Sequence, residues 1–421
     1  MAFDRIPLTG LDHFFLALEK HNERLNTVGS TCRYFFELDG VLTVGELKSL
    51  LCQHPLSARL SGVRLKKRSV VSGSFWEVGD QSEIAIHEIV SGEQIPQKVL
   101  EYTIDSNANA PYFCFFLIQR PNERTTVVFV WHHLLMDGYG AVLYMKSLNE
   151  GSTEIFFKGK NKEKVVFSDA RDAKKFVSKT SRPELTTVFS GEVNPDTVPA
   201  VRIIDFSEGS SEKIRLNSVQ NGAKFGQSTF FLAACGIAVR KMLLTRGGKV
   251  DNFWVPVPQD QRKKMAKGPV LSNHLSLLFY RLEKSKMKGG LRQLTTDLTA
   301  QMKNQIKYRT PDKYNSLMHY LRVVPKRVYY RFIKGPHGGA ISSFLFTVAP
   351  EHPDELSQLF GRKVVDAMNL PPLTFPPGLT FAFAKFQTKT RIFVLYSKDA
   401  LSESEVDNLE DTLKVLLEKG E

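Results

Sequence analysis

An apolar run that ends in two histidines constrains this chain more than any other feature. Residues 125–131 are all β-branched or aromatic, which predicts a buried strand. His132 and His133 follow the run, and an Asp137-Gly138 pair then turns the chain into a helical pattern. A strand that ends in imidazoles places groups that titrate near neutral pH at the edge of a core. We therefore interpret this segment as an active-site loop.

Length, charge and cysteine usage limit the class of protein. A chain of 421 residues is too long for one ordinary domain and predicts two. The net charge of +13 favours a partner that carries phosphate or an anionic surface. No Cys-x-x-Cys pair is present, so the four cysteines are expected to be reduced thiols of an intracellular protein: Cys32, Cys52, Cys114 and Cys235.

The sequence also bears on where the protein resides. No apolar run approaches the roughly 18 residues that span a bilayer. The N-terminal segment lacks both the basic start and the apolar core of a signal peptide. We expect a cytoplasmic protein whose contact with membrane or lipid, if any, is peripheral.

Hydrophobic patterning divides the chain into two predicted domains. Residues 1–165 mix helices and strands and carry the histidine loop. Residues 166–200 have a thin apolar signal, which predicts a crossover, and residues 201–421 form the second domain. Helices and strands do not alternate in a strict βαβ rhythm. The fold class is therefore expected to be α+β, with sandwich domains rather than a doubly wound sheet.

Three of the predicted helices have recognisable starts. Capping boxes begin helices at Thr43 and at Ser402. A third helix, over residues 230–244, is expected to be capped by Ser228 or Thr229. This helix is apolar nearly all round, which predicts that it is buried.

Alternation along a strand decides how the two histidines divide their roles. Neighbouring side chains that leave a strand point to opposite sides, so only one of His132 and His133 faces a given cavity. The other is expected to face the interior and to hold the loop by hydrogen bonds. Asp137, beside a glycine in a turn, is expected to accept backbone N–H bonds or to pair with an arginine. On this interpretation one histidine is a general base and the other is structural.

Other chemistries for this loop lack parts in the sequence. His133 and Asp137 could share a helical face around a metal ion, but no third ligand lies nearby. No Gly-x-Ser-x-Gly elbow and no cysteine in a nucleophile context is present. No nucleic-acid-binding signature accompanies the positive charge. If His133 is the catalyst, the nucleophile must come from a substrate, which fits direct acyl transfer.

The pattern His132-His133-x-x-x-Asp137-Gly138 resembles the signature of the coenzyme-A-dependent acyltransferase superfamily. That superfamily includes chloramphenicol acetyltransferase, plant alcohol acyltransferases, peptide-synthetase condensation domains and bacterial wax ester synthase/diacylglycerol acyltransferases. Further stretches are similar, in order, to the wax ester synthase branch: residues 7–16, 226–244, 255–258, 272–276 and 377–396. The chain departs from that branch at Ser272, where a glycine usually precedes Asn273.

The resemblance implies two chloramphenicol-acetyltransferase-like domains with a tunnel at their interface. His133, the second histidine of the motif, would be the general base in this tunnel, and no acyl-enzyme would form. Asn273, or the nearby Ser276, would contact the substrate or its oxyanion. The donor would be acyl-CoA as a co-substrate, with no permanently bound cofactor and no metal. The acceptor would be a hydrophobic alcohol or a hydroxylated metabolite.

Two other functions stay open at this stage. A condensation-type ester or amide synthase would share the histidine but take its acyl group from the phosphopantetheine of a carrier protein. A catalytically retired lipid-binding module would keep only the fold, and the intact histidine motif argues against it. Basic clusters within residues 262–267, 284–288 and 322–334 are candidates to meet coenzyme A phosphates, an acidic carrier protein or anionic lipid.

Overall fold

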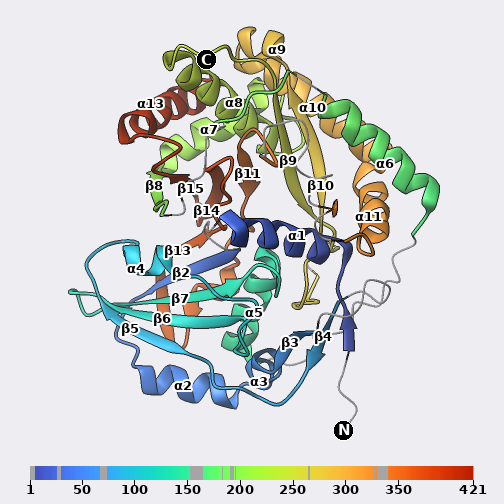
Figure 1. The fold of residues 1–421 in the computed structure, drawn as a ribbon. Helices are drawn as coiled ribbons and strands as arrows, with labels where there is room; N and C mark the ends of the chain where they lie inside the picture. The colour runs from blue at the N-terminus through green and yellow to red at the C-terminus, as the bar shows by residue number, and fades with distance from the viewer. Residues whose placement is uncertain are drawn as a thin grey trace.

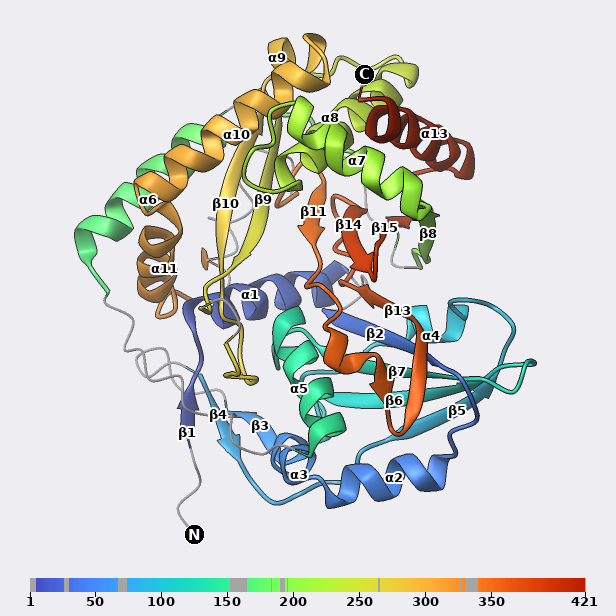
Figure 2. The ribbon, with the colours of Figure 1, turned by 180° about the vertical axis from the view of Figure 1, so that it is seen from behind.

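The computed structural model describes residues 5–25, 30–66, 74–151, 165–182, 184–189, 194, 196–263, 266–325, 328–329 and 340–420. It consists of two halves, each with helices packed on a sheet, and α1 lies where the halves meet (Figures 1 and 2). The first half contains β1 (Arg5–Pro7), α1 (Gly10–Leu25), β2 (Thr31–Leu38), α2 (Val44–Gln53), α3 (Pro55–Ser61), β3 (Val63–Lys66), β4 (Phe75–Val78), β5 (Ile86–Val90), α4 (Gln97–Glu101), β6 (Phe113–Gln119), β7 (Thr125–His132) and α5 (Gly138–Glu150).

The rest of the chain supplies the second half and one segment that returns to the first. Its elements are α6 (Phe167–Thr180), β8 (Pro199–Asp205), α7 (Glu208–Gln220), α8 (Ser228–Thr245), β9 (Phe253–Asp260), β10 (Leu275–Leu282), α9 (Lys284–Lys288), α10 (Leu291–Lys307), α11 (Thr310–Leu321), β11 (Leu345–Val348), a 3-10 turn (Asp354–Leu356), β12 (Gln358–Leu359), β13 (Arg362–Leu370), β14 (Leu379–Phe386), β15 (Lys389–Ser397) and α13 (Glu403–Lys419).

The predicted strand at residues 125–131 is the central β7 of the larger sheet. The strand order is β12-β13-β2-β7-β6-β5, and β5 and β6 are the parallel pair. Every residue of β7 is buried. One face, with Phe129 and Trp131, joins a cluster with residues of α2, α3 and α5, and the other face, with Val128 and Val130, joins residues of the second sheet. A strand covered on both faces needs apolar side chains at every position, which explains the unbroken run.

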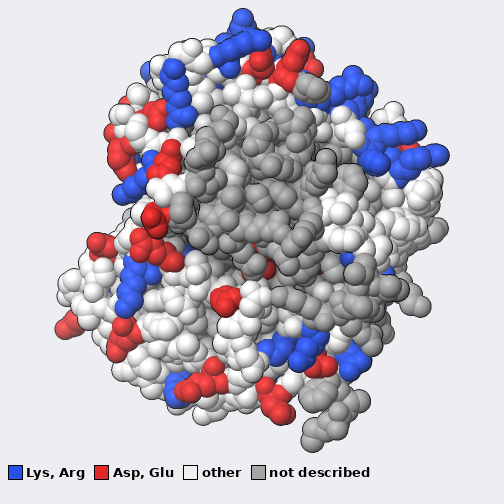
Figure 3. Space-filling view, viewed as in Figure 1, with Lys and Arg blue, Asp and Glu red and all other residues white. Residues whose placement is uncertain are grey.

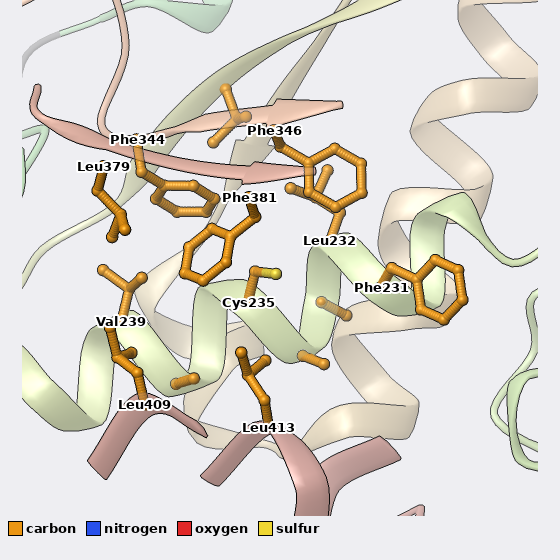
Figure 4. Close-up of a cluster of buried hydrophobic side chains, with 14 of the residues drawn as sticks. Phe231, Leu232, Cys235, Val239, Phe344, Phe346, Leu379, Phe381, Leu409 and Leu413 are labelled. Atoms are coloured by element: carbon orange, nitrogen blue, oxygen red, sulfur yellow. The ribbon is translucent and has the colours of Figure 1, made fainter. Parts of the chain in front are cut away.

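The second half is built around α8. Its sheet has the order β11-β14-β15-β8, and β9 pairs with β10 in a separate hairpin. Figure 4 shows α8 between strand residues such as Phe381 and the helix α13, which contributes Leu409 and Leu413. The predicted burial of this helix is confirmed, because it has buried residues on all sides.

Two expectations about α8 need correction. The first is that no apolar run approaches the length that spans a bilayer. The 18 residues of α8 have a mean hydropathy of 1.4, so one helix in the described part of the chain is long and apolar enough to cross a bilayer. Because 67% of it is buried inside the fold, it matches the core helix of a globular half. The predicted cap is wrong, since the position before the helix is Gln227 and makes no side-chain capping bond. The Thr229 hydroxyl lies instead 2.9 Å from that of Thr299 on α10. The capping boxes at Thr43 and Ser402 are confirmed.

The prediction divided the chain into two consecutive domains, but two segments of the second domain pack against the first half. Residues 358–370, expected in the second domain, form β12 and β13 and extend the first sheet beside β2. Residues 266–274, which lead into β10, reach from the second half to α5, where the Tyr139 hydroxyl donates to the backbone oxygen of Ala266 (Figure 2). Residues 166–200 include the 14-residue α6, which contacts α11, rather than a bare crossover. Strand pairing and helix docking between distant segments leave no signal in local patterning, and this explains the difference.

Candidate active site

His132 and His133 point to opposite sides at the end of β7, as alternation predicted. The His132 side chain is 1% exposed, and its Nε2 lies 2.7 Å from Oε1 of Glu19 on α1. Its Nδ1 accepts a hydrogen bond of 3.1 Å from the backbone N–H of Leu134. Since Nδ1 accepts, the ring proton resides on Nε2 and points at the carboxylate. His132 therefore ties the loop to α1 and does not face the cavity.

His133 lies at the wall of the cavity between the halves. Its ring stacks on Phe15 of α1, with centroids 4.2 Å apart. Its Nδ1 has no hydrogen-bond partner in the described part of the structure. Burial lowers the pKa of His133 below its usual 6.5, and the Asp137 charge acts in the opposite direction. At neutral pH the imidazole is therefore uncharged, and one of its two ring nitrogens can accept a proton.

Asp137 holds the loop to the second half. Its carboxylate accepts hydrogen bonds from the N–H groups of Gly140 (2.8 Å) and His274 (2.8 Å), and from Nη1 of Arg262 (3.0 Å). The Asp137 side chain is fully buried and that of Arg262 is 3% exposed. Both predicted roles of Asp137, acceptor of backbone bonds and partner of an arginine, are confirmed by these contacts. Gly138 follows as the first residue of α5 and lines the cavity.

Arg262 was predicted to belong to a basic cluster on the surface, but its side chain is buried. Its guanidinium also contacts Asp260 and lies 5.5 Å from the ring centre of Tyr139. These groups occupy the charge, so Arg262 is not available to a phosphate. Of the cluster in residues 322–334, residues 326–327 and 330–334 lie outside the described residues, as does 264 of the first cluster.

Asn273 positions the histidine rather than contacting the substrate. One N–H of its Nδ2 donates to Asp12 (2.8 Å) and the other to the backbone oxygen of His133 (2.9 Å). Its backbone N–H donates to Asp12 as well (3.0 Å). Because an amide has two side-chain N–H groups, none is left for an oxyanion. The predicted oxyanion role of Asn273 is corrected to the positioning of His133.

Ser276 does not contact the cavity either. Its hydroxyl donates to the backbone oxygen of Pro311 (2.8 Å) and the residue is fully buried. Leu275 and Leu277, its neighbours along β10, line the cavity. Side chains alternate along a strand, so Ser276 points to the opposite face. Its predicted substrate contact is corrected for this reason.

Ser272 shows how the chain accommodates its departure from the family pattern. Its φ of +73° lies in the left-handed region that favours glycine. Its backbone N–H donates to the oxygen of Leu135 (2.7 Å), and its hydroxyl accepts from Nε1 of Trp76 (3.2 Å). Two bonds to the first half thus hold a conformation that costs a serine about 1 kcal/mol or more.

Sequence patterns did not identify three residues that hold this site together: Asp12, Glu19 and Arg262. Asp12 and Glu19 are seven residues apart on α1, among apolar residues such as Leu16 that are also buried. Two carboxylates on the apolar face of one helix are unusual, and that pattern could have revealed them. Arg262 lies 125 residues from Asp137 in the chain, and no local pattern connects the two.

A cavity of about 540 Å³ lies between the halves and includes His133 in its wall. Elements of both halves line it: α1, the end of β7, the start of α5, α6, β9, β10, α11, β11 and the end of β13. Most of the lining side chains are apolar, with Lys174 and Asp260 among the exceptions. Within the described residues, no group of three or more His, Cys, Asp and Glu side chains is arranged to hold a metal ion.

No protein-family model and no curated protein matches the sequence. Solved structures do match over nearly the whole chain. The first condensation domain of the calcium-dependent antibiotic synthetase has a TM-score of 0.70 at 14% identity, covering 99% of this chain and 96% of that one. The chain has the condensation-domain fold.

Two other matches show the range of proteins with this fold. The trichothecene 15-O-acetyltransferase of Fusarium sporotrichioides has a TM-score of 0.70 at 14% identity, over 98% of this chain and 94% of that one. A variant starter condensation domain of rhizomide synthetase, in complex with C8-CoA, has a TM-score of 0.66 at 15% identity, over 99% and 94%. The predicted α+β fold class, with two halves, is confirmed.

Proposed function

We propose that this protein transfers an acyl group from a thioester, acyl-CoA, to the hydroxyl of a hydrophobic alcohol or hydroxylated metabolite. The observation that carries the proposal is the place of His133, an uncharged imidazole, in the wall of a mainly apolar cavity between the halves. A general base in such a place activates a nucleophile that a substrate brings.

The proposed reaction needs no covalent enzyme intermediate. His133 accepts the proton of the acceptor hydroxyl while its oxygen forms a bond to the thioester carbonyl carbon. The tetrahedral intermediate then collapses, the carbon–sulfur bond breaks, and His133 returns the proton to the departing thiolate. The ester and the free thiol leave. Asp137, Asn273 and His132 hold the loop, which keeps the imidazole oriented through both proton transfers.

The charge around the cavity supports a polyanionic donor. Four basic side chains are exposed along α6: Arg171, Lys174, Lys175 and Lys179. Lys174 also lines the cavity. In Figure 3 lysine and arginine gather on the part of the second half where Figure 1 places α6 and α10. The phosphates of coenzyme A suit such a surface, and one protein of this fold was solved with C8-CoA.

A condensation-type synthase is the second candidate. Condensation domains are among the proteins of this fold, and an acidic carrier protein would suit the same basic α6. The wax ester product, the peripheral lipid contact and the cytoplasmic location belong to the proposal as further expectations.

The test is to mix purified protein with a series of acyl-CoA donors and pooled alcohols and amines. We expect release of free CoA that depends on the acceptor, with an ester found by mass spectrometry. Release with a loaded carrier protein but not with acyl-CoA would favour the condensation-type reaction. A covalent acyl-protein in the presence of donor alone would contradict the proposed mechanism.

The rate is expected to depend on pH through His133. The base works only when uncharged, and burial lowers its pKa below 6.5, so kcat/KM should keep its plateau below pH 6.5 before it falls. On acidification the imidazole of residue 133 is protonated at a higher pH in the unfolded chain than in the folded protein. The contribution of His133 to the free energy of unfolding is thus present above pH 6.5 and is lost as the pH falls through its folded pKa. Rates and urea unfolding over the same pH series check both, and a fall of kcat/KM centred above pH 6.5 would contradict the assignment.

A further inference from the structure

The cavity contains a polar side chain that the reaction above does not use. Asn369 is at the end of β13 and lines the cavity. Its Nδ2 is buried and has no hydrogen-bond partner among the described residues. Leaving a buried amide N–H unpaired costs about 1–3 kcal/mol. An unpaired donor in a substrate cavity therefore indicates a partner that arrives with the substrate.

Asn369 lies beside the histidine motif. A Cβ placed on Gly138 would be 3.7 Å from Nδ2 of Asn369, so this amide lies over the first residue of α5. His133 and Gly138 line the same cavity. The N-terminal end of α5 adds a partial positive charge there, which favours a developing negative charge.

The other polar groups around the motif are already engaged. The Asn273 amide donates to Asp12 and His133, and the Ser276 hydroxyl donates to Pro311. The hydroxyls of Thr380 and Tyr329 also line the cavity and have no partner among the described residues, but neither is among the atoms nearest to Gly138. Asn369 is thus the unpaired side-chain donor that the described structure places against Gly138.

We propose that Nδ2 of Asn369 donates a hydrogen bond to the carbonyl oxygen of the acyl thioester. The bond strengthens when the acceptor oxygen attacks the carbonyl carbon and the carbonyl π electrons move onto that oxygen. When the carbon–sulfur bond breaks, the electron pair returns to re-form the carbonyl. The assignment rests on the proposed acyl transfer for its place in turnover. Strand β13 pairs with β2, with Asn369 opposite Tyr34, so the backbone that carries the donor is fixed before substrate binds.

Two variants of Asn369 test this role in catalysis. Asn369→Leu keeps the size of the side chain and removes both N–H groups, and Asn369→Ala removes the amide entirely. Loss of one oxyanion donor typically lowers kcat by about 10²–10³-fold. We expect such a fall in kcat, together with a rise in KM for the acyl-CoA of no more than about tenfold, because the same hydrogen bond also holds the ground-state carbonyl. Asn408→Ala, on the exposed side of α13, is the matched control and should keep the wild-type rate.

Binding without turnover separates this inference from the proposed function. An acyl-CoA analogue with a ketone in place of the thioester keeps the carbonyl oxygen, and a thioether analogue lacks it. Asn369→Leu should weaken binding of the ketone analogue about tenfold, which corresponds to the loss of a single hydrogen bond. The affinity for the thioether analogue should stay unchanged, and calorimetry measures both.

Each outcome has a distinct meaning. A wild-type protein that releases no CoA but binds the ketone in an Asn369-dependent way would overturn the proposed turnover and keep the Asn369 contact. An active wild type whose Asn369 variants keep their kcat would overturn the Asn369 role alone. Equal loss for both analogues, or no binding of either to the wild type, would also overturn it. Thermal unfolding of each variant shows whether it is folded.

Discussion

Replacing His133 by alanine is expected to lower turnover by about 10²–10⁴-fold, which is the contribution of a positioned general base. The fold should survive. The loop contacts made by His133 to Ser30 and Asn273 use its backbone N–H and oxygen, which the substitution keeps. The side chain contributes a ring contact with Phe15, so a modest loss of stability is expected. CoA release and thermal unfolding measure the two effects separately.

A matched control for this variant is His87→Ala. His87 lies on the edge strand β5, and its ring contacts Tyr102 and Phe116 rather than the cavity. This variant also loses an imidazole that packs against aromatic rings, and it should keep the wild-type rate. A His133→Ala protein that is folded and retains a rate within tenfold of wild type would show that another group is the base.

The substitution Asp137→Ala is expected to lower stability as well as activity. It leaves the Arg262 guanidinium buried with one carboxylate fewer, and removing one partner of a buried ion pair costs about 3–5 kcal/mol. Loss of the cap on α5, the bond from Gly140, adds about 1 kcal/mol. Residual contact of Arg262 with Asp260 reduces the total. The free energy of unfolding in urea gives the size of the effect.

An exposed ion pair provides the comparison for Asp137. Asp407 pairs with Arg202 at 2.7 Å but its side chain is 60% exposed, so Asp407→Ala should change stability by less than about 1 kcal/mol. Replacing Arg262 by methionine in the Asp137→Ala background should restore part of the stability, since the buried guanidinium is then gone and the Asp260 carboxylate that it leaves behind is 36% exposed to water. Equal effects of the Asp137 and Asp407 substitutions would contradict the role assigned to the buried pair.

Local sequence patterns predicted the elements that carry the site better than the contacts that complete it. The apolar run 125–131 is a strand because each of its faces is covered, and the two histidines diverge because side chains alternate at its end. The acceptor role of Asp137 in its turn also follows from neighbours in the chain. In contrast, Asn273 and Ser276 were assigned by resemblance, and hydrogen bonds to distant groups removed both from the substrate.

The sequence by itself determined the strand, the divergent histidine pair, the buried α8 and the two capping boxes, because short-range sterics and hydrophobic periodicity govern these features. Only the tertiary structure decided which arginine pairs with Asp137, which carboxylate supports His132, and that β13 joins the first sheet and carries Asn369 to the motif. Those contacts join segments more than 100 residues apart. Their free energy depends on burial and docking geometry, to which a local stretch of sequence has no access.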